Sequence, residues 1–201
     1  MDENTTPAKL SKYLELLSPG SRYVLSFSPF FVNHLSVSLV SHLVVNTRKR
    51  ILYVCIGRPH IFIQKMLQNR SVPIRNIHFM DMVLGVARRP RSPEEGGLFF
   101  PDDGSNVEFQ GLYKIFKVDQ EVDRLSLDEI DLIVFDNISE LRTYNNDDRV
   151  RSMVELLARI SDRAGKGIFI LHINNRPNDG ISELTSEIGF ETVNVPNDVF
   201  K

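Results

Sequence analysis

The sequence predicts an α/β fold, a three-layer arrangement in which helices sandwich a mainly parallel sheet. Several short runs are almost entirely apolar, as in strands that are covered on both faces. These runs are residues 51–56, 131–136 and 167–173. Segments with apolar residues at helical spacing separate them. This alternation is typical of parallel sheets, because parallel strands need crossover connections that are usually helices.

The first half of the chain predicts two strand–helix units and one further strand. The pair Pro19-Gly20 marks the turn before the first strand, and Pro59 suits the first turn of the second helix. Leucines and valines recur at helical spacing through the first helix, which indicates that much of its surface is covered. In order, the elements are a strand over 22–28, a helix over 30–46, a strand over 51–56, a helix from 59 and a short strand over 76–80.

The second half predicts two buried strands, two helices and an edge strand. The longer helix follows the capping pair Asn145-Asn146 and stops at Gly165. The last strand alternates apolar and polar residues, as an edge strand does. In order, the elements are a strand over 131–136, a helix over 147–164, a strand over 167–173, a short helix over 181–189 and a strand over 190–195.

One segment interrupts this order. Residues 85–106 are rich in proline, glycine and charge, and we expect a mobile insertion loop there within a single domain spanning 1–201. Residues 107–118 favour a hairpin that turns at Gln110-Gly111.

The composition narrows the possible functions. The 201 residues include 24 lysines and arginines against 26 aspartates and glutamates, so no basic excess points to nucleic acid as a partner. The single cysteine, Cys55, can form neither an internal disulfide nor a multi-cysteine zinc site. No run approaches the ~18 apolar residues of a membrane helix, and the acidic N-terminus does not look like a signal peptide. We therefore expect a cytoplasmic protein that does not enter a membrane.

In their order along the chain, these elements resemble the RecA-like ATPase core, and within it the KaiC-like branch common in archaea. The resemblance spans about residues 18–175. Residues 18–27 resemble the entry into the family's phosphate-loop strand, and residues 48–56 resemble its second strand. Residues 131–136, followed by Asn137 and Ile138, resemble its Walker B strand. The resemblance implies the core topology of a P-loop NTPase.

The phosphate-loop position departs from the family pattern. That loop needs glycines that let backbone N–H groups wrap phosphates, a lysine, and a hydroxyl for magnesium. The equivalent stretch, residues 28–35, has no glycine, with His34 at the lysine position and Leu35 at the hydroxyl position. Residues 57–59, Gly-Arg-Pro, replace the carboxylates with which KaiC-like ATPases activate water. We therefore expect no functional P-loop, no ATPase activity, no catalytic residue and no cofactor.

Two residues remain candidates for contacts at this degenerate nucleotide site. His34 and Asp136 stand at the Walker A and Walker B positions. Asp136 could hold magnesium, but we favour a strand-end aspartate that caps the next turn through Asn137. We also expect Phe30 or Phe31 to fill the space of the loop, and we assign no metal ligands.

The resulting expectation is a non-catalytic RecA/KaiC-like domain that acts in regulation or assembly through protein contacts. A protein partner or further copies of the chain would bind at the insertion, where Phe99, Phe100, Arg88 and Arg89 are the candidate contacts. The alternatives are an ATPase with an atypical site and a recombination-type accessory protein acting near DNA. The basic clusters lack interleaved aromatic residues, so we do not expect nucleic acid as a partner.

Overall fold

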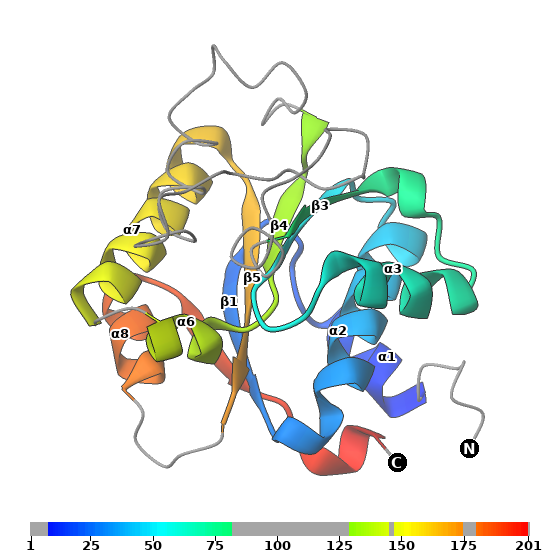
Figure 1. Ribbon diagram of the computed structural model, residues 1–201, viewed down its shortest axis with the longest axis horizontal. Coiled ribbons are helices and arrows are strands. Elements are labelled where there is room, and N and C mark those ends of the chain that lie inside the picture. The colour runs from blue at the N-terminus through cyan, green and yellow to red at the C-terminus, as the bar shows by residue number, and fades with distance from the viewer. Residues whose placement is uncertain (1–7, 82–128, 145–146, 175–179, 201) are drawn as a thin grey trace.

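Within the residues that the structure describes, six strands form one parallel sheet in the order β3-β2-β4-β5-β1-β6 (Figure 1). This computed structural model describes residues 8–81, 129–144, 147–174 and 180–200. The strands are β1 (Arg22–Phe27), β2 (Ile51–Cys55), β3 (Ile77–Asp81), β4 (Leu132–Phe135), β5 (Gly167–Ile173) and β6 (Glu191–Asn194). The predicted fold class is confirmed, and β6 lies at the edge of the sheet as its alternating sequence indicated.

The helices also follow the predicted order, with two additions. The helices are α1 (Ala8–Glu15), α2 (Val32–Ser41), α3 (His60–Asn69), α6 (Ile138–Tyr144), α7 (Asp147–Ala164) and α8 (Ile181–Glu187). Single turns are η1 (Pro29–Phe31), the π-helical η2 (His42–Asn46), η3 (Ile74–Asn76) and η6 (Asn197–Phe200). The short helices α1 and α6 were missed in the sequence.

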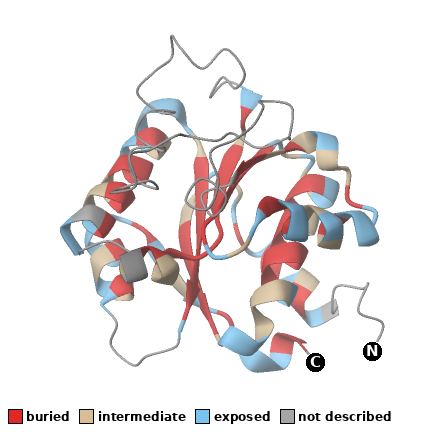
Figure 2. Ribbon diagram, viewed as in Figure 1, coloured by how far each residue is buried: buried red, intermediate tan, exposed pale blue. Residues whose placement is uncertain are grey.

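The helices form two layers, and each layer has its own core. Helices α1, α2 and α3 cover one face of the sheet, and α6, α7 and α8 cover the other (Figure 1). Successive strand residues alternate between the layers: Leu25 packs in the core of α1 to α3, and Val24 in the core of α6 to α8. Both faces of the central strands are therefore buried, which explains their uniformly apolar sequences (Figure 2).

Several sequence-based expectations fall outside the described residues. These are the insertion over 85–106, the hairpin over 107–118, and the candidate partner contacts Phe99, Phe100, Arg88 and Arg89. Among the described residues, no helix combines the length and the apolar character that crossing a bilayer requires.

Candidate functional site

Parallel strands bring three polar segments to one edge of the sheet, at the carboxyl ends of the strands. Arg58 follows β2 and Asp136 follows β4, and these two strands are neighbours. Asn33 and Ser36 lie in the first turns of α2, which follows β1. The carboxyl ends of parallel strands share an edge, where ligands bind in folds of this class. The same edge is where the sequence predicted a degenerate nucleotide site.

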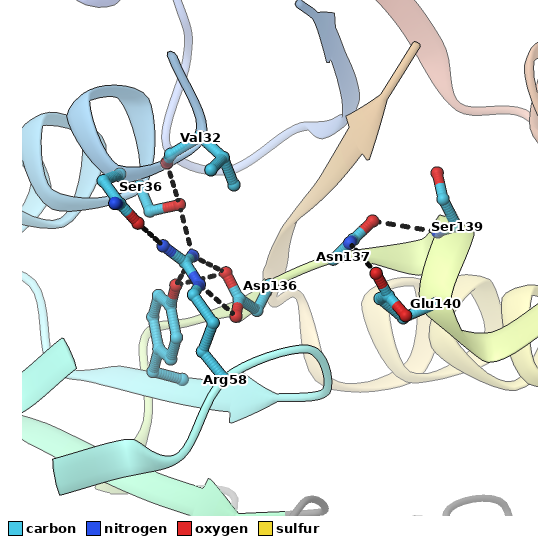
Figure 3. Close-up of polar contacts among 9 residues, drawn as sticks. Val32, Ser36, Arg58, Asp136, Asn137, Ser139 and Glu140 are labelled. Carbon is cyan, nitrogen blue, oxygen red and sulfur yellow. Dashed lines mark hydrogen bonds and ion pairs between the residues drawn. The ribbon is translucent and has the colours of Figure 1, made fainter. Parts of the chain in front are cut away.

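An arginine of the same chain binds the carboxylate of Asp136 (Figure 3). The guanidinium of Arg58 donates from Nη2 to Oδ1 and, at 3.3 Å, from Nε to Oδ2. The hydroxyl of Tyr53 donates to Oδ1 at 2.7 Å. Both oxygens of the carboxylate therefore already accept hydrogen bonds from charged or polar donors within the chain.

The same guanidinium also holds the start of α2. Its Nη1 donates to Oδ1 of Asn33, and its Nη2 donates to Oγ of Ser36 at 2.8 Å (Figure 3). The hydroxyl of Ser36 in turn donates to the carbonyl of Val32 at 2.7 Å. Arg58 thus ties the loop after β2, the end of β4 and the first turns of α2 into one cluster. We refer to Asn33, Ser36, Tyr53, Arg58 and Asp136 as the Arg58 cluster.

The charges of this cluster are largely removed from water. The side chain of Asp136 is fully buried, and that of Arg58 is 16% exposed. Burial, together with the negative charge of Asp136, raises the pKa of Tyr53 well above its ordinary value, so the phenol keeps the proton that it donates. Burial alone would lower the pKa of Arg58, but the neighbouring Tyr53 and Asp136 reverse the effect and raise it. The guanidinium therefore stays charged beside the carboxylate.

The turn between β1 and α2 uses its own backbone N–H groups. Pro29 has no N–H, that of Phe31 donates to the carbonyl of Ser28 at 3.0 Å, and that of Val32 donates to the carbonyl of Pro29. A phosphate cradle needs such N–H groups to point at the ligand. In this turn they close the short helix η1.

Two phenylalanines in this turn lie in different surroundings. Phe31 stacks on Phe200 of η6, with ring centroids 4.2 Å apart and an interplanar angle of 2°. Phe30 is 89% exposed. One of the two expected aromatic rings therefore packs beside the loop, and the other points into solvent.

The two candidate nucleotide contacts are not brought together. Asp136 is the centre of the Arg58 cluster, whereas His34 is exposed on the first turn of α2. Asn137 caps the next turn by accepting the N–H of Ser139 at 3.1 Å, as predicted. Asp136 itself takes part in an ion pair rather than in that cap.

The partners of Asp136 were not predicted from the sequence. Arg58 was considered only as a residue that replaces a carboxylate, and Asn33, Ser36 and Tyr53 were not singled out. A usable signal was present: an arginine two residues after the buried strand predicted over 51–56, and an aspartate at the end of the buried strand predicted over 131–136. The order of the strands was needed to see that the two charges meet.

The Arg58 cluster is an internal ion pair that is supported by hydrogen bonds within the chain. Magnesium binds carboxylate oxygens and keeps several waters around it. At Asp136 the guanidinium of Arg58 already supplies the positive charge. In the part of the chain that the structure describes, no three histidine, cysteine, aspartate or glutamate side chains group as metal ligands would.

Comparisons with known proteins agree on the fold. No family model matches the sequence, and no curated protein matches it. Among solved structures, KaiC-like protein PH0186 from the hyperthermophilic archaeon Pyrococcus horikoshii OT3 is similar, with a TM-score of 0.55 and 9% identity over 92% of this chain and 76% of the other. A second protein from that organism, PH0250, is similar with a TM-score of 0.56 and 11% identity over 94% of this chain and 88% of the other. Together with the sheet order and the two helical layers, these similarities show that the chain has a KaiC/RecA-like fold.

Proposed function

We propose that this chain is a non-catalytic KaiC/RecA-like domain that acts in regulation or assembly through contacts with a protein partner or with further copies of itself. One observation carries the proposal: Asp136, at the Walker B position, is fully buried and bound by Arg58. A magnesium ion at Asp136 would have to displace an arginine that also holds Asn33 and Ser36. Displacement would leave a buried guanidinium without its counter-ion, which is costly.

The turn after β1 supports the same proposal. Residues 28–35 contain neither glycine nor lysine, and the N–H groups of Phe31 and Val32 already bond within η1. ATP hydrolysis needs cradled phosphates, a bound metal and a positioned water. Around Asp136, the residues that would meet these three requirements differ from those of the intact family pattern.

Exposed apolar side chains support a role in binding proteins. Phe30 follows β1 and is 89% exposed; Ile61 and Phe62 follow β2 and are 61% and 46% exposed. These three residues follow the carboxyl ends of β1 and β2, and the Arg58 cluster lies at the same end of the sheet. Aromatic side chains at the centre of an interface contribute much of its binding energy.

The first prediction concerns nucleotide. Saturating Mg-ATP should leave the melting temperature of the full chain unchanged, and no phosphate should be released above background. A ligand at 100 times its dissociation constant would add about 2.7 kcal/mol of stability, which a thermal-shift assay detects easily. Stabilisation by Mg-ATP, or phosphate release that Asp136→Asn abolishes, would favour an ATPase with an atypical site instead.

The second prediction concerns association. Replacing Phe99 and Phe100 with serine should weaken self-association or partner capture by about 2–4 kcal/mol while leaving the melting temperature unchanged. Phe30→Ser should act in the same direction, since its exposed ring can be removed without opening the core. The matched control is Leu16→Ser, because Leu16 is 80% exposed but lies before β1, outside the turn between β1 and α2. Sedimentation velocity and affinity capture from host lysate measure the effect.

Three results would contradict the proposal. A chain that stays monomeric at high concentration and captures no protein would have no partner to act through. A phenylalanine double variant that melts earlier would place Phe99 and Phe100 in the core. Salt-dependent binding to DNA would favour the accessory role near DNA.

A further inference from the structure

Residues on α1, on α2 with η2 and at the end of α3 line a cavity. These three helices cover one face of the sheet (Figure 1). This cavity has a volume of about 270 Å³. The residues around it come from α1, from the end of α2 and the π-helical turn η2, and from the end of α3. They are Ser11, Ser38, Ser41, His42, Val45, Asn46, Arg70 and Val72. None of these eight belongs to the Arg58 cluster, so the cavity is separate from the site described above.

The lining favours a negatively charged ligand. Arg70 contributes a positive charge, three serines contribute hydroxyl groups, and none of the eight residues is acidic. The guanidinium of Arg70 donates from Nη1 to Oγ of Ser38 at 3.0 Å. This hydrogen bond holds one of the two terminal nitrogens of the planar guanidinium in place. Arginine and hydroxyl donors are the groups that recognise carboxylates and phosphates.

The histidine of the cavity adds a neutral polar group. Burial lowers the pKa of His42, although the negative charge of Glu15 works in the opposite direction. Its Nδ1 lies 3.1 Å from Nδ2 of Asn46. The imidazole is therefore oriented by Asn46, and Arg70 carries the fixed charge among the lining residues.

A buried hydroxyl in this cavity lacks a hydrogen-bond partner. Oγ of Ser41 is buried and makes no hydrogen bond to any described residue of the chain. Other helical hydroxyls behave differently: those of Ser36, Thr47 and Thr185 each donate to the carbonyl four residues earlier. Buried polar groups almost always have partners, so an exception beside a cavity calls for an explanation such as a ligand.

Two departures from regular helix place these groups around one space. Turn η2 is π-helical, and its i→i+5 bonding places Ser41 and Asn46 one turn apart. At the end of α3, Ser71 has φ +57, and the N–H of Val72 bonds the carbonyl of Leu67 at 3.0 Å. This Schellman turn redirects the chain between Arg70 and Val72, both of which line the cavity.

From this geometry we propose that the cavity binds a small organic anion through its carboxylate or phosphate group, with Arg70 and the hydroxyl of Ser41 as the main contacts. The volume lies just below the usual range of ligand pockets, about 300–1,000 Å³, so it suits an anionic group on a short carbon skeleton. This site is independent of the proposed lack of catalysis, because it shares no residue with the Arg58 cluster.

The test uses two probes that distinguish the sources of the anion: inorganic phosphate and succinate. Each is titrated into the full-length ¹⁵N-labelled chain at constant ionic strength, and the backbone amides are followed by NMR. At least one probe should produce saturable shifts at Ser11, Ser41, Arg70 and Val72. Arg70→Gln should weaken binding by tenfold or more, whereas Arg75→Gln, at an exposed arginine of η3, should leave it unchanged.

Ser41→Ala separates a binding role from a structural one. It should weaken the probe about tenfold while leaving the melting temperature of the unbound chain unchanged or higher, because alanine leaves no unpartnered hydroxyl. Two NMR results would overturn the proposal. One is amide shifts that grow linearly with probe concentration and persist in Arg70→Gln, and the other is no saturable shift with either probe. A lower melting temperature for Ser41→Ala would also overturn it. If Arg70→Gln fails to fold, the Ser41→Ala comparison decides alone.

Discussion

Asp136→Ala should lower the free energy of unfolding by about 3–5 kcal/mol, because it leaves the guanidinium of Arg58 largely buried without its counter-ion. The hydroxyl of Tyr53 loses its acceptor in the same step. Urea denaturation of the variant and the parent chain measures the difference. A loss of this size would be a large fraction of the stability of an ordinary domain.

A double-mutant cycle tests whether the loss comes from the pair. Arg58→Met combined with Asp136→Leu should cost less than the sum of the two single changes, since apolar residues of similar volume need no counter-ion. The control is Glu187→Ala, which removes an ion pair with Arg151 that is exposed on both sides. That change should hardly move the denaturation midpoint. Single losses as small as the control's would mean that water reaches the Arg58–Asp136 pair in solution.

Gly167→Ala should destabilise the chain by about 3 kcal/mol or more. A Cβ built at Gly167 would lie 1.8 Å from the carbonyl oxygen of Pro19 and 2.9 Å from its carbonyl carbon. Both are backbone atoms, so no side-chain rotation relieves the contact. The segment before β1 is also fixed by the N–H of Ile168, which donates to the carbonyl of Ser21 at 3.0 Å. Alanine must therefore push the start of β1 away from β5.

The neighbouring glycine supplies the control for this prediction. No atom lies within 4 Å of a Cβ at Gly20, so Gly20→Ala should be close to neutral. Thermal and urea denaturation of both variants compare the two positions. Equal effects at Gly20 and Gly167 would mean that the entry to β1 is looser than the structure describes.

Much of the fold was predictable because its physical signals are local. A strand covered on both faces needs an apolar residue at nearly every position, and β2, β4 and β5 show that in sequence. Helix α7 has its start and stop signals directly beside it in sequence, the pair Asn145-Asn146 before it and Gly165 after it. Helices α1 and α6 were not predicted, and short helices such as these gain most of their stability from packing against the rest of the molecule.

The candidate site was predictable only in part, because it depends on contacts between distant segments. Asp136 could be recognised from its own strand, and the loss of the phosphate loop from a missing lysine and missing glycines. The role of Arg58 required the knowledge that β2 and β4 are neighbours. The orphaned hydroxyl of Ser41 required three helices to be placed, since no sequence pattern marks a missing partner.

The long sequence separation within the Arg58 cluster has a consequence for folding kinetics. Arg58 and Asp136 are 78 positions apart and meet only after β2 and β4 lie side by side. Long-range pairing of parallel strands is slow, because loop-closure entropy is lost before the contacts form. An ion pair that depends on this pairing should form late, after the main barrier to folding. Its strength then acts mainly on the unfolding rate, so it governs how long the folded protein persists more than how quickly it forms.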